Sequence, residues 1–226
     1  MCMSDVGDKY ERHWQVRMER EPDEDFWRYE RNWALPNLLR EGENFLDLAS
    51  GSSIVGEFAK KKFNCKVKAL DISKTAVKEA KKRGVDARVG SVEERLPFGN
   101  GSFDTVFWGD NIEHVFAPLE VMAEARRVLV KGGRLVISTP NQAYWRYRWH
   151  MFTKGELPKT EGEDNKPWEW GHIRFFNRQI LRDLFKEAGF RELDFIGVSR
   201  RRLDKPFLKI WPELFGMIMV IEVIKI

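Results

Sequence analysis

Short apolar runs alternate with stretches of helical periodicity through the middle of the chain, and this alternation constrains the fold most. An apolar run at 44–48 is followed by small residues at 49–53, and apolar side chains then recur at helical spacing as far as Phe63. Further strand-like runs follow at 67–72, 87–90, 103–108 and 134–139. Because strands that alternate with helices are typical of a mainly parallel sheet covered by helices, the sequence predicts an α/β fold.

Residues with strong positional preferences support the helices of this pattern. Ser73 and Asn177 are expected to cap two helices at their N-termini. Pro118 suits the first turn of a third helix, whose buried stripe is expected to run as far as Leu129. Two late strands are expected near 191–197 and 215–225.

Length and composition limit the classes of protein that this chain can be. Its 226 residues favour one domain, and a net charge of +4 does not argue for nucleic acid as a partner. Two cysteines, Cys2 and Cys65, exclude a disulfide framework and a cysteine-based zinc site, and no metal site is predicted. No basic region precedes an apolar run at the N-terminus, and the longest apolar stretch, 217–226, is shorter than the roughly 20 residues of a membrane span. We therefore expect a cytoplasmic protein with no membrane-spanning segment.

Two segments interrupt the alternating pattern, and both are rich in aromatic residues. One is helical in composition and comprises residues 1–34, and the other lies at 141–172. A long irregular segment inside a compact domain is commonly a lid or a binding loop. We expect one domain with four parts: an N-terminal helical cap (1–40), a cofactor-binding half (41–140), an aromatic substrate insertion (141–176) and a C-terminal helix with strands (177–226).

A small-residue loop and a later aspartate suggest a cofactor that contains a nucleoside. The loop around Gly51 lies between the first strand and the first helix of the pattern, where small residues let a ligand approach the backbone. Asp71 ends the next strand, 20 residues later, where a carboxylate can accept both hydroxyls of a ribose. A dinucleotide is disfavoured because the loop lacks two of the three glycines that a pyrophosphate requires. A tight turn beside a surface aspartate is the alternative interpretation.

Several short motifs occur in an order that resembles a known family. Residues 46–53 (LDLASGSS) stand where that family has L-D-x-G-x-G-x-G. The other matching segments are LPF at 96–98, GSFD at 101–104, EHV at 113–115, RVLVKGG at 127–133, STPN at 138–141 and EAGF at 187–190. Over residues 40–197 the chain resembles class I S-adenosylmethionine-dependent methyltransferases of the ubiquinone/menaquinone-methyltransferase-like (type 11) group.

The resemblance implies a Rossmann-like sandwich, a cofactor and a set of cofactor contacts. It implies a mainly parallel seven-stranded sheet with its last strand antiparallel, helices on both faces, and S-adenosylmethionine as the cofactor. Asp71 would bind the ribose hydroxyls, and Ser91 stands where the family usually has an aspartate that contacts adenine. The full set of implied cofactor contacts is Asp47, Ala49, Ser50, Gly51, Asp71, Ile72, Ser91, Val92, Trp108 and Gly109.

Methyl transfer from a sulfonium needs an aligned nucleophile, and a hydroxyl or amine nucleophile also needs a base, commonly histidine. His114 follows the fourth strand, at the sheet edge where open α/β folds bind ligands. His172 closes the aromatic insertion. We therefore expect His114 and His172 to be the catalytic candidates, with a structural role as the alternative for His114 and a substrate contact as the alternative for His172. His13 and His150 are expected to be surface or packing residues.

The aromatic insertion supplies the candidate substrate contacts. Its segment 144–150 (YWRYRWH) interleaves aromatic residues with Arg146 and Arg148, which suits an anionic aromatic, nucleotide-linked or lipid-like substrate and also single-stranded nucleic acid. The predicted substrate contacts are Tyr144, Trp145, Trp149 and Trp170. The alternative is that Trp145 and Trp149, four residues apart, pack one helix onto the sheet.

Taken together, the sequence predicts methyl transfer to an oxygen, nitrogen or carbon atom of a small molecule. A non-catalytic module that binds the cofactor or a partner is the first alternative, because the glycine loop keeps only Gly51 of the family's three glycines. An RNA methyltransferase is the second, disfavoured by the mild charge and by GDNI at 109–112, where base N-methyltransferases have a proline-containing motif. An NAD-dependent oxidoreductase is the third, disfavoured by the segments at 127–133 and 187–190. The substrate and the oligomeric state stay open.

Overall fold

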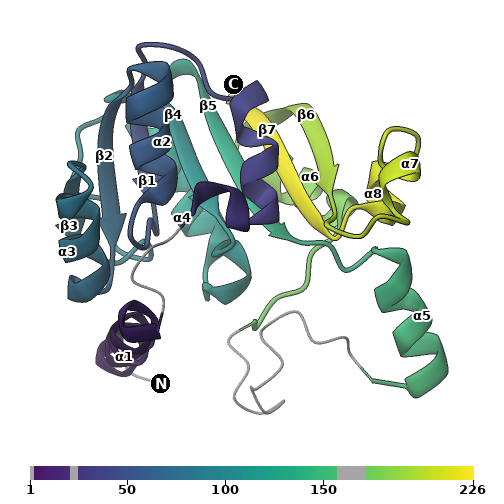
Figure 1. Cartoon of the computed structure of the whole chain (residues 1–226). Coiled ribbons are helices and arrows are strands. Elements are labelled where there is room, and N and C mark those ends of the chain that lie inside the picture. Colours follow the sequence, from purple (N-terminus) through teal and green to yellow (C-terminus); the bar gives the residue numbers. More distant parts are fainter. Residues whose placement is uncertain (1–2, 21–24, 157–171) are drawn as a thin grey trace.

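A seven-stranded sheet forms the centre of the molecule in the computed structural model, which describes residues 3–20, 25–156 and 172–226 (Figure 1). The strand order is β3-β2-β1-β4-β5-β7-β6. The strands are β1 (Asn44–Leu48), β2 (Lys66–Asp71), β3 (Asp86–Val89), β4 (Phe103–Gly109), β5 (Leu129–Pro140), β6 (Phe190–Val198) and β7 (Ile218–Lys225). Strands β1 to β5 pair in parallel, whereas β7 lies antiparallel to both β5 and β6. The predicted Rossmann-like fold is therefore confirmed.

Side chains alternate between the two faces of this sheet and build two separate cores. Leu46 and Val106 belong to the core on one face, whereas Phe45 and Phe107 belong to the core on the other. The helices α4 (Pro118–Val128) and α6 (Arg178–Glu187) contribute buried residues to the first core. The second core contains buried residues of α2 (Ile54–Phe63), α3 (Lys74–Lys82) and the 3₁₀ turns Phe26–Arg28 and Leu35–Asn37. The helices thus cover both faces.

Three helices begin with the N-terminal residues that the sequence predicts for them. The Ser73 hydroxyl accepts a hydrogen bond from the Ala76 N–H, and the Asn177 side chain accepts one from the Ile180 N–H. Pro118 is the first residue of α4. The expectation for Leu129 is wrong, because α4 ends at Val128 and Leu129 already pairs with Phe103 in β5.

The remaining helices lie outside these two layers. They are α1 (Met3–Arg20), α5 (Trp145–Lys154), α7 (Lys205–Leu208) and α8 (Pro212–Phe215). Two further 3₁₀ turns span Glu30–Trp33 and Ile112–His114, and Ile112 belongs to the first core. Figure 1 shows α5 extending away from the sheet. Helix α5 has no buried residue, and Trp149 keeps 62% of its surface exposed. The expectation that Trp145 and Trp149 pack a helix onto the sheet is therefore wrong. No helix in the described ranges combines the length and apolarity that crossing a bilayer requires.

A buried ion cluster ties the centre of the sheet to the segment before β1. Arg134 in β5 is almost fully buried, and its guanidinium donates to the carboxylate of Glu222 in β7. It also donates to both carboxylate oxygens of Glu43, at 2.7 and 2.8 Å, and to the Leu38 carbonyl at 2.8 Å. A buried charge is tolerated only when its partners replace the water that it has lost.

We expect Arg134→Met to lower the free energy of unfolding by about 3–5 kcal/mol, because it leaves the buried Glu222 carboxylate with only the exposed Arg40, at 3.7 Å, as a cation. Urea denaturation followed by circular dichroism measures this change. The matched control is Lys131→Met at an exposed position of the same strand, which should change stability by less than about 0.5 kcal/mol. Equal stabilities of the two variants would contradict the importance of the cluster.

Candidate active site

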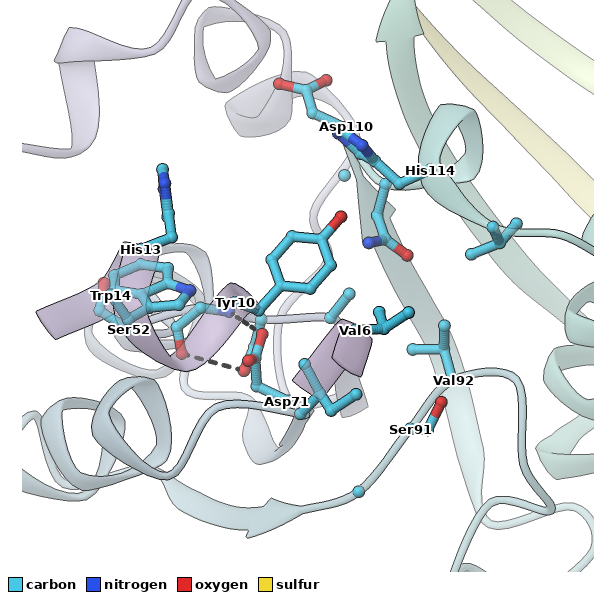
Figure 2. Close-up of a pocket in the computed structure, with 18 of the residues that line it drawn as sticks. Val6, Tyr10, His13, Trp14, Ser52, Asp71, Ser91, Val92, Asp110 and His114 are labelled. Carbon is cyan, nitrogen blue, oxygen red and sulfur yellow. Dashed lines mark hydrogen bonds between the residues drawn. The ribbon is translucent and has the colours of Figure 1, made fainter. Parts of the chain in front are cut away.

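A pocket lies at the carboxyl ends of β1, β2 and β4, and α1 forms one of its walls (Figure 2). The ends of the strands contribute the loop 49–52, Asp71 and Ile72, and the segment 109–111. The space measures about 1230 Å³ including its opening to solvent. The residues of α1 on this wall are Val6, Tyr10, His13, Trp14 and Arg17. Concave sites of this kind at the carboxyl edge of an α/β sheet are where such folds bind ligands.

The loop after β1 keeps the shape of a glycine loop although most of its glycines are missing. Ala49, Gly51 and Ser53 have φ angles of 53°, 55° and 52°, in the left-handed region that favours glycine. At Gly51, an added Cβ would lie 2.3 Å from Cζ2 of Trp14, so only glycine lets α1 pack this closely. The backbone therefore has the conformation that close approach of a ligand requires. Ala49 and Ser53 adopt this conformation at a cost that glycine would not have.

Asp71 joins this loop to the start of α3. Its carboxylate accepts hydrogen bonds from the Gly51 N–H at 2.7 Å and from the Ser73 N–H at 2.9 Å. Burial raises the pKa of Asp71 above its usual range, and these two hydrogen bonds act in the opposite direction. Asp71 nevertheless lines the pocket, so its carboxylate lies within reach of a ligand's hydroxyl groups.

Glu11 holds α1 over the pocket. Its carboxylate accepts hydrogen bonds from the Ser73 hydroxyl at 2.7 Å, the Thr75 hydroxyl at 2.6 Å and the Thr75 N–H at 3.2 Å. Burial acts to raise the pKa of Glu11, but these hydrogen bonds outweigh it and lower the pKa to about 2. The carboxylate also lies at the N-terminus of α3, where a negative charge is favoured.

Two predicted cofactor contacts lie behind the pocket wall. Asp47 is buried and accepts hydrogen bonds from the Ser53 hydroxyl at 2.7 Å and the Gly56 N–H at 3.2 Å. Burial raises the pKa of Asp47 to about 7. Trp108 is fully buried and donates its indole N–H to Asn111 at 2.8 Å. Both side chains therefore support the loops that line the pocket, and neither lines it.

Arginines and aromatic rings form one side of the pocket. Arg17 and Arg31 each lie over the ring of Tyr29, at 5.4 and 4.9 Å from its centroid. Arg31 also pairs with the Asp110 carboxylate at 2.5 Å, and Asp110 accepts a hydrogen bond from the Ser138 hydroxyl at 2.6 Å. All except Ser138 line the pocket, so this side carries positive charge next to Gly109.

His114 and His172, the two predicted catalytic candidates, lie close together although they are 58 residues apart in the chain. His114 lines the pocket, and the centroid of its ring lies 4.6 Å from that of His172, with the rings nearly perpendicular. Nε2 of His172 lies 3.9 Å from the carboxylate of Glu113. Glu113 is buried and accepts a hydrogen bond from the Thr139 hydroxyl. Burial, followed by the charge of Asp110, raises the pKa of Glu113 well above its usual range.

The same three side chains could hold a metal ion, since one potential ligand atom from each lies within 4.8 Å of the others. Tetrahedral zinc with bonds of 2.0–2.1 Å requires ligand atoms about 3.4 Å apart, so metal binding would require them to move closer. A proton relay through His172 to Glu113 likewise requires movement, because 3.9 Å is longer than a hydrogen bond.

The predicted substrate contacts lie away from this pocket. The Tyr144 hydroxyl donates to the buried Asp204 at 2.6 Å, and the Trp145 indole N–H donates to the same carboxylate at 3.0 Å. Trp149 is exposed on α5. None of the three lines the pocket, and Trp170 lies outside the described residues. Asp204 accepts hydrogen bonds from both Tyr144 and Trp145, which anchors the start of α5, and a substrate role for these residues stays a prediction.

Eight of the ten predicted cofactor contacts line the pocket. They are Ala49, Ser50, Gly51, Asp71, Ile72, Ser91, Val92 and Gly109. The sequence did not identify five residues that also line the pocket: His13, Arg17, Tyr29, Arg31 and Asp110. The residues of α1 in this group could have been found, because positions 6, 10, 13, 14 and 17 share one face of a helix.

The comparisons with known proteins agree with this geometry. The profile of the family described as "Methionine biosynthesis protein MetW" matches residues 30–223. The chain belongs to this MetW family. A demethylmenaquinone methyltransferase from Alkalihalophilus pseudofirmus is 29% identical over 176 residues, which cover 69% of this chain and 73% of that protein. A ubiquinone biosynthesis O-methyltransferase from Xanthomonas oryzae is 34% identical over 107 residues, which cover 45% and 44% of the two chains.

The solved structures show the same fold. A SAM-dependent methyltransferase from Thermotoga maritima, described as a possible histamine N-methyltransferase, superposes with a TM-score of 0.66. The two chains are 23% identical, and the superposition covers 97% of this chain and 95% of that one. The MetW-family chain is a class I S-adenosylmethionine-dependent methyltransferase of the ubiquinone/menaquinone-methyltransferase-like group.

The pocket fits this cofactor on two observations. Gly51 lines the pocket with backbone alone, beside the Trp14 ring of α1, and Asp71 presents a buried carboxylate 20 residues later at the end of β2. When bound, S-adenosylmethionine supplies an activated methyl group, so the chain's own residues need only bind, orient and exclude water.

We expect Ala49→Gly to stabilise the protein by about 0.5–1 kcal/mol. Removing the Cβ relieves a left-handed conformation that costs roughly 1–2 kcal/mol, and the added flexibility of the unfolded chain offsets part of the gain. Thermal unfolding measures the change. The control Ala123→Gly, on the exposed face of α4, should destabilise by about 0.5–1 kcal/mol. A loss of stability in Ala49→Gly would show that the loop gains nothing from glycine.

We expect Glu11→Gln to release α1 from α3, because a neutral amide accepts weaker hydrogen bonds than a carboxylate. Hydrogen exchange of α1 should become faster, whereas Glu19→Gln on the exposed face of the helix should leave it unchanged. The pH dependence follows from the lowered pKa of Glu11. In the native chain the contribution of this contact is complete above pH 4.5 and is lost as the pH falls towards about 2. Unchanged exchange in Glu11→Gln would contradict the role of this contact.

Proposed function

We propose that this methyltransferase acts on an oxygen or carbon nucleophile of a small aromatic molecule of the phenol or quinol class, with His114 as its base. The supporting observation is that His114 lines the cofactor pocket and is backed by His172 and the buried Glu113. The names of relatives that act in ubiquinone and menaquinone biosynthesis support the substrate class.

The residues divide into a cofactor end and an acceptor end. Asp71 is proposed to accept hydrogen bonds from the ribose hydroxyls, with Ile72 and Val92 against the adenine. Arg17 and Arg31 are proposed to attract the methionine carboxylate, since both lie over Tyr29 in the pocket wall and Arg31 lies next to Gly109. Figure 2 shows Asp71 and His114 on opposite sides of Tyr10, which separates the two ends.

The chemistry assigned to His114 is transfer of one proton. Its imidazole takes the proton of the nucleophile as the bond from the nucleophile to the methyl carbon forms and the bond from that carbon to sulfur breaks. His172 then lies behind an imidazolium ion. The new positive charge would favour ionisation of Glu113, whose carboxylate would stabilise it in turn. The positive charge moves from the sulfonium to the imidazole in this step, and α1, which forms one wall of the pocket, limits the access of water to the reacting groups.

Two measurements test this proposal. Calorimetric titration with S-adenosylhomocysteine should show saturable binding to the native chain, and Asp71→Ala should lose it. His114→Gln should keep this binding within about threefold but lower kcat for demethylmenaquinol or catechol acceptors by roughly 10²–10⁴-fold.

His172→Gln should lower kcat less and shift the pH profile of kcat, which a purely structural role would not do. His150→Gln on α5 is the matched control and should leave both binding and kcat unchanged. Full activity of His114→Gln would contradict its role as the base. Failure of the folded native chain to bind the ligand would contradict the assignment of the pocket.

A further inference from the structure

Residues 200–211, between β6 and α8, combine exposed apolar side chains with basic ones. Leu203, Phe207, Ile210 and Trp211 keep 75%, 47%, 80% and 60% of their surface exposed. Apolar residues scattered singly on a surface are ordinary, but four large ones within nine positions indicate a surface that binds something.

The charges of this segment are almost entirely positive. Arg201, Arg202, Lys205 and Lys209 are exposed, and no carboxylate in the described part of the chain forms a salt bridge with them. The one acid within the segment, Asp204, is buried and faces inward. The segment therefore presents cations and apolar groups together to solvent, a combination that suits a partner which is both apolar and negatively charged.

Asp204 also connects this segment to α5, which has the same character. The carboxylate accepts hydrogen bonds from the Tyr144 hydroxyl and the Trp145 indole N–H at the start of α5. Beyond this anchor Trp149 and Phe152 keep 62% and 83% of their surface exposed. One buried carboxylate thus holds two apolar and basic elements in a fixed relation.

Both elements lie at the same edge of the sheet as the cofactor pocket. Helix α5 follows β5, and residues 200–211 follow β6. Strands β5 and β6 are both antiparallel to β7 and therefore run in the same direction, so both elements follow carboxyl ends. The pocket is built on the carboxyl ends of β1, β2 and β4. A large flat partner at this edge would face the pocket.

We propose that residues 200–211 and α5 bind the surface of an anionic lipid bilayer, from which the enzyme takes a membrane-resident acceptor. Tryptophan and phenylalanine favour the interface between headgroups and acyl chains, and exposed lysine and arginine are attracted to anionic headgroups. The acceptor class rests on the proposed function above, whereas the lipid surface rests on residues outside the pocket.

The test is sedimentation of the full chain with vesicles. We expect binding to vesicles of phosphatidylglycerol and phosphatidylcholine, much weaker binding to phosphatidylcholine alone, and weaker binding at high salt. Ile210→Ser/Trp211→Ser should weaken binding at least tenfold, and Lys205→Gln/Lys209→Gln should do the same for the anionic vesicles.

Matched controls lie at the far side of the sheet. Val89→Ser in the edge strand β3 removes an exposed apolar side chain, and Lys74→Gln/Lys78→Gln in α3 removes two exposed cations. Both should leave vesicle binding unchanged, and all four variants should bind S-adenosylhomocysteine as the native chain does.

Three results would overturn the proposal: no binding to anionic vesicles, equal losses in the controls, or a change of oligomeric state in the 210/211 variant with vesicle binding intact. The last result would show that a second copy of the chain covers this surface. Vesicle binding by a chain that does not bind S-adenosylhomocysteine would instead contradict the proposed function and leave the lipid surface in place.

Discussion

The carboxylate of Asp71 holds together the segments that make the cofactor pocket. It accepts the Gly51 N–H from the loop after β1 and the Ser73 N–H at the start of α3, and it also lines the pocket. Ser73 and Thr75, just beyond it, bind Glu11 and so position α1. The loop after β1, helix α3 and the covering helix α1 therefore all depend on residues 71–75, at the end of β2 and the start of α3.

The glycine loop shows how a departure from a family motif can preserve its geometry. Ala49 and Ser53 have the left-handed φ angles that glycine would adopt without cost, and buried Asp47 binds the Ser53 hydroxyl and the Gly56 N–H. Gly51 alone has no substitute, because Trp14 occupies the space that a Cβ would need. The comparisons favour an active methyltransferase over the non-catalytic alternative that the missing glycines suggested.

Features governed by neighbouring residues could be predicted from the sequence, whereas contacts between distant segments could not. The alternation of apolar runs with helical stretches predicted the strands and helices, and Ser73 and Asn177 marked two helix starts. The positions of the family motifs predicted eight residues that line the pocket. Asp47 and Trp108 were misplaced because a motif identifies a position but not the face towards which its side chain points. The hydrogen bonds from Tyr144 and Trp145 to Asp204 could not be predicted, because Asp204 lies some 60 residues further along the chain.

We propose that α1 closes over a cofactor bound against Gly51 and Asp71, which are hydrogen-bonded to each other. Hydrogen exchange measured by mass spectrometry, with and without S-adenosylhomocysteine, tests it most directly. We predict that the ligand slows exchange in residues 3–20, 49–53 and 71–76, and leaves residues 200–211 unchanged. Protection of the loop without α1 would contradict the closing role of this helix, and protection of neither would contradict the site itself.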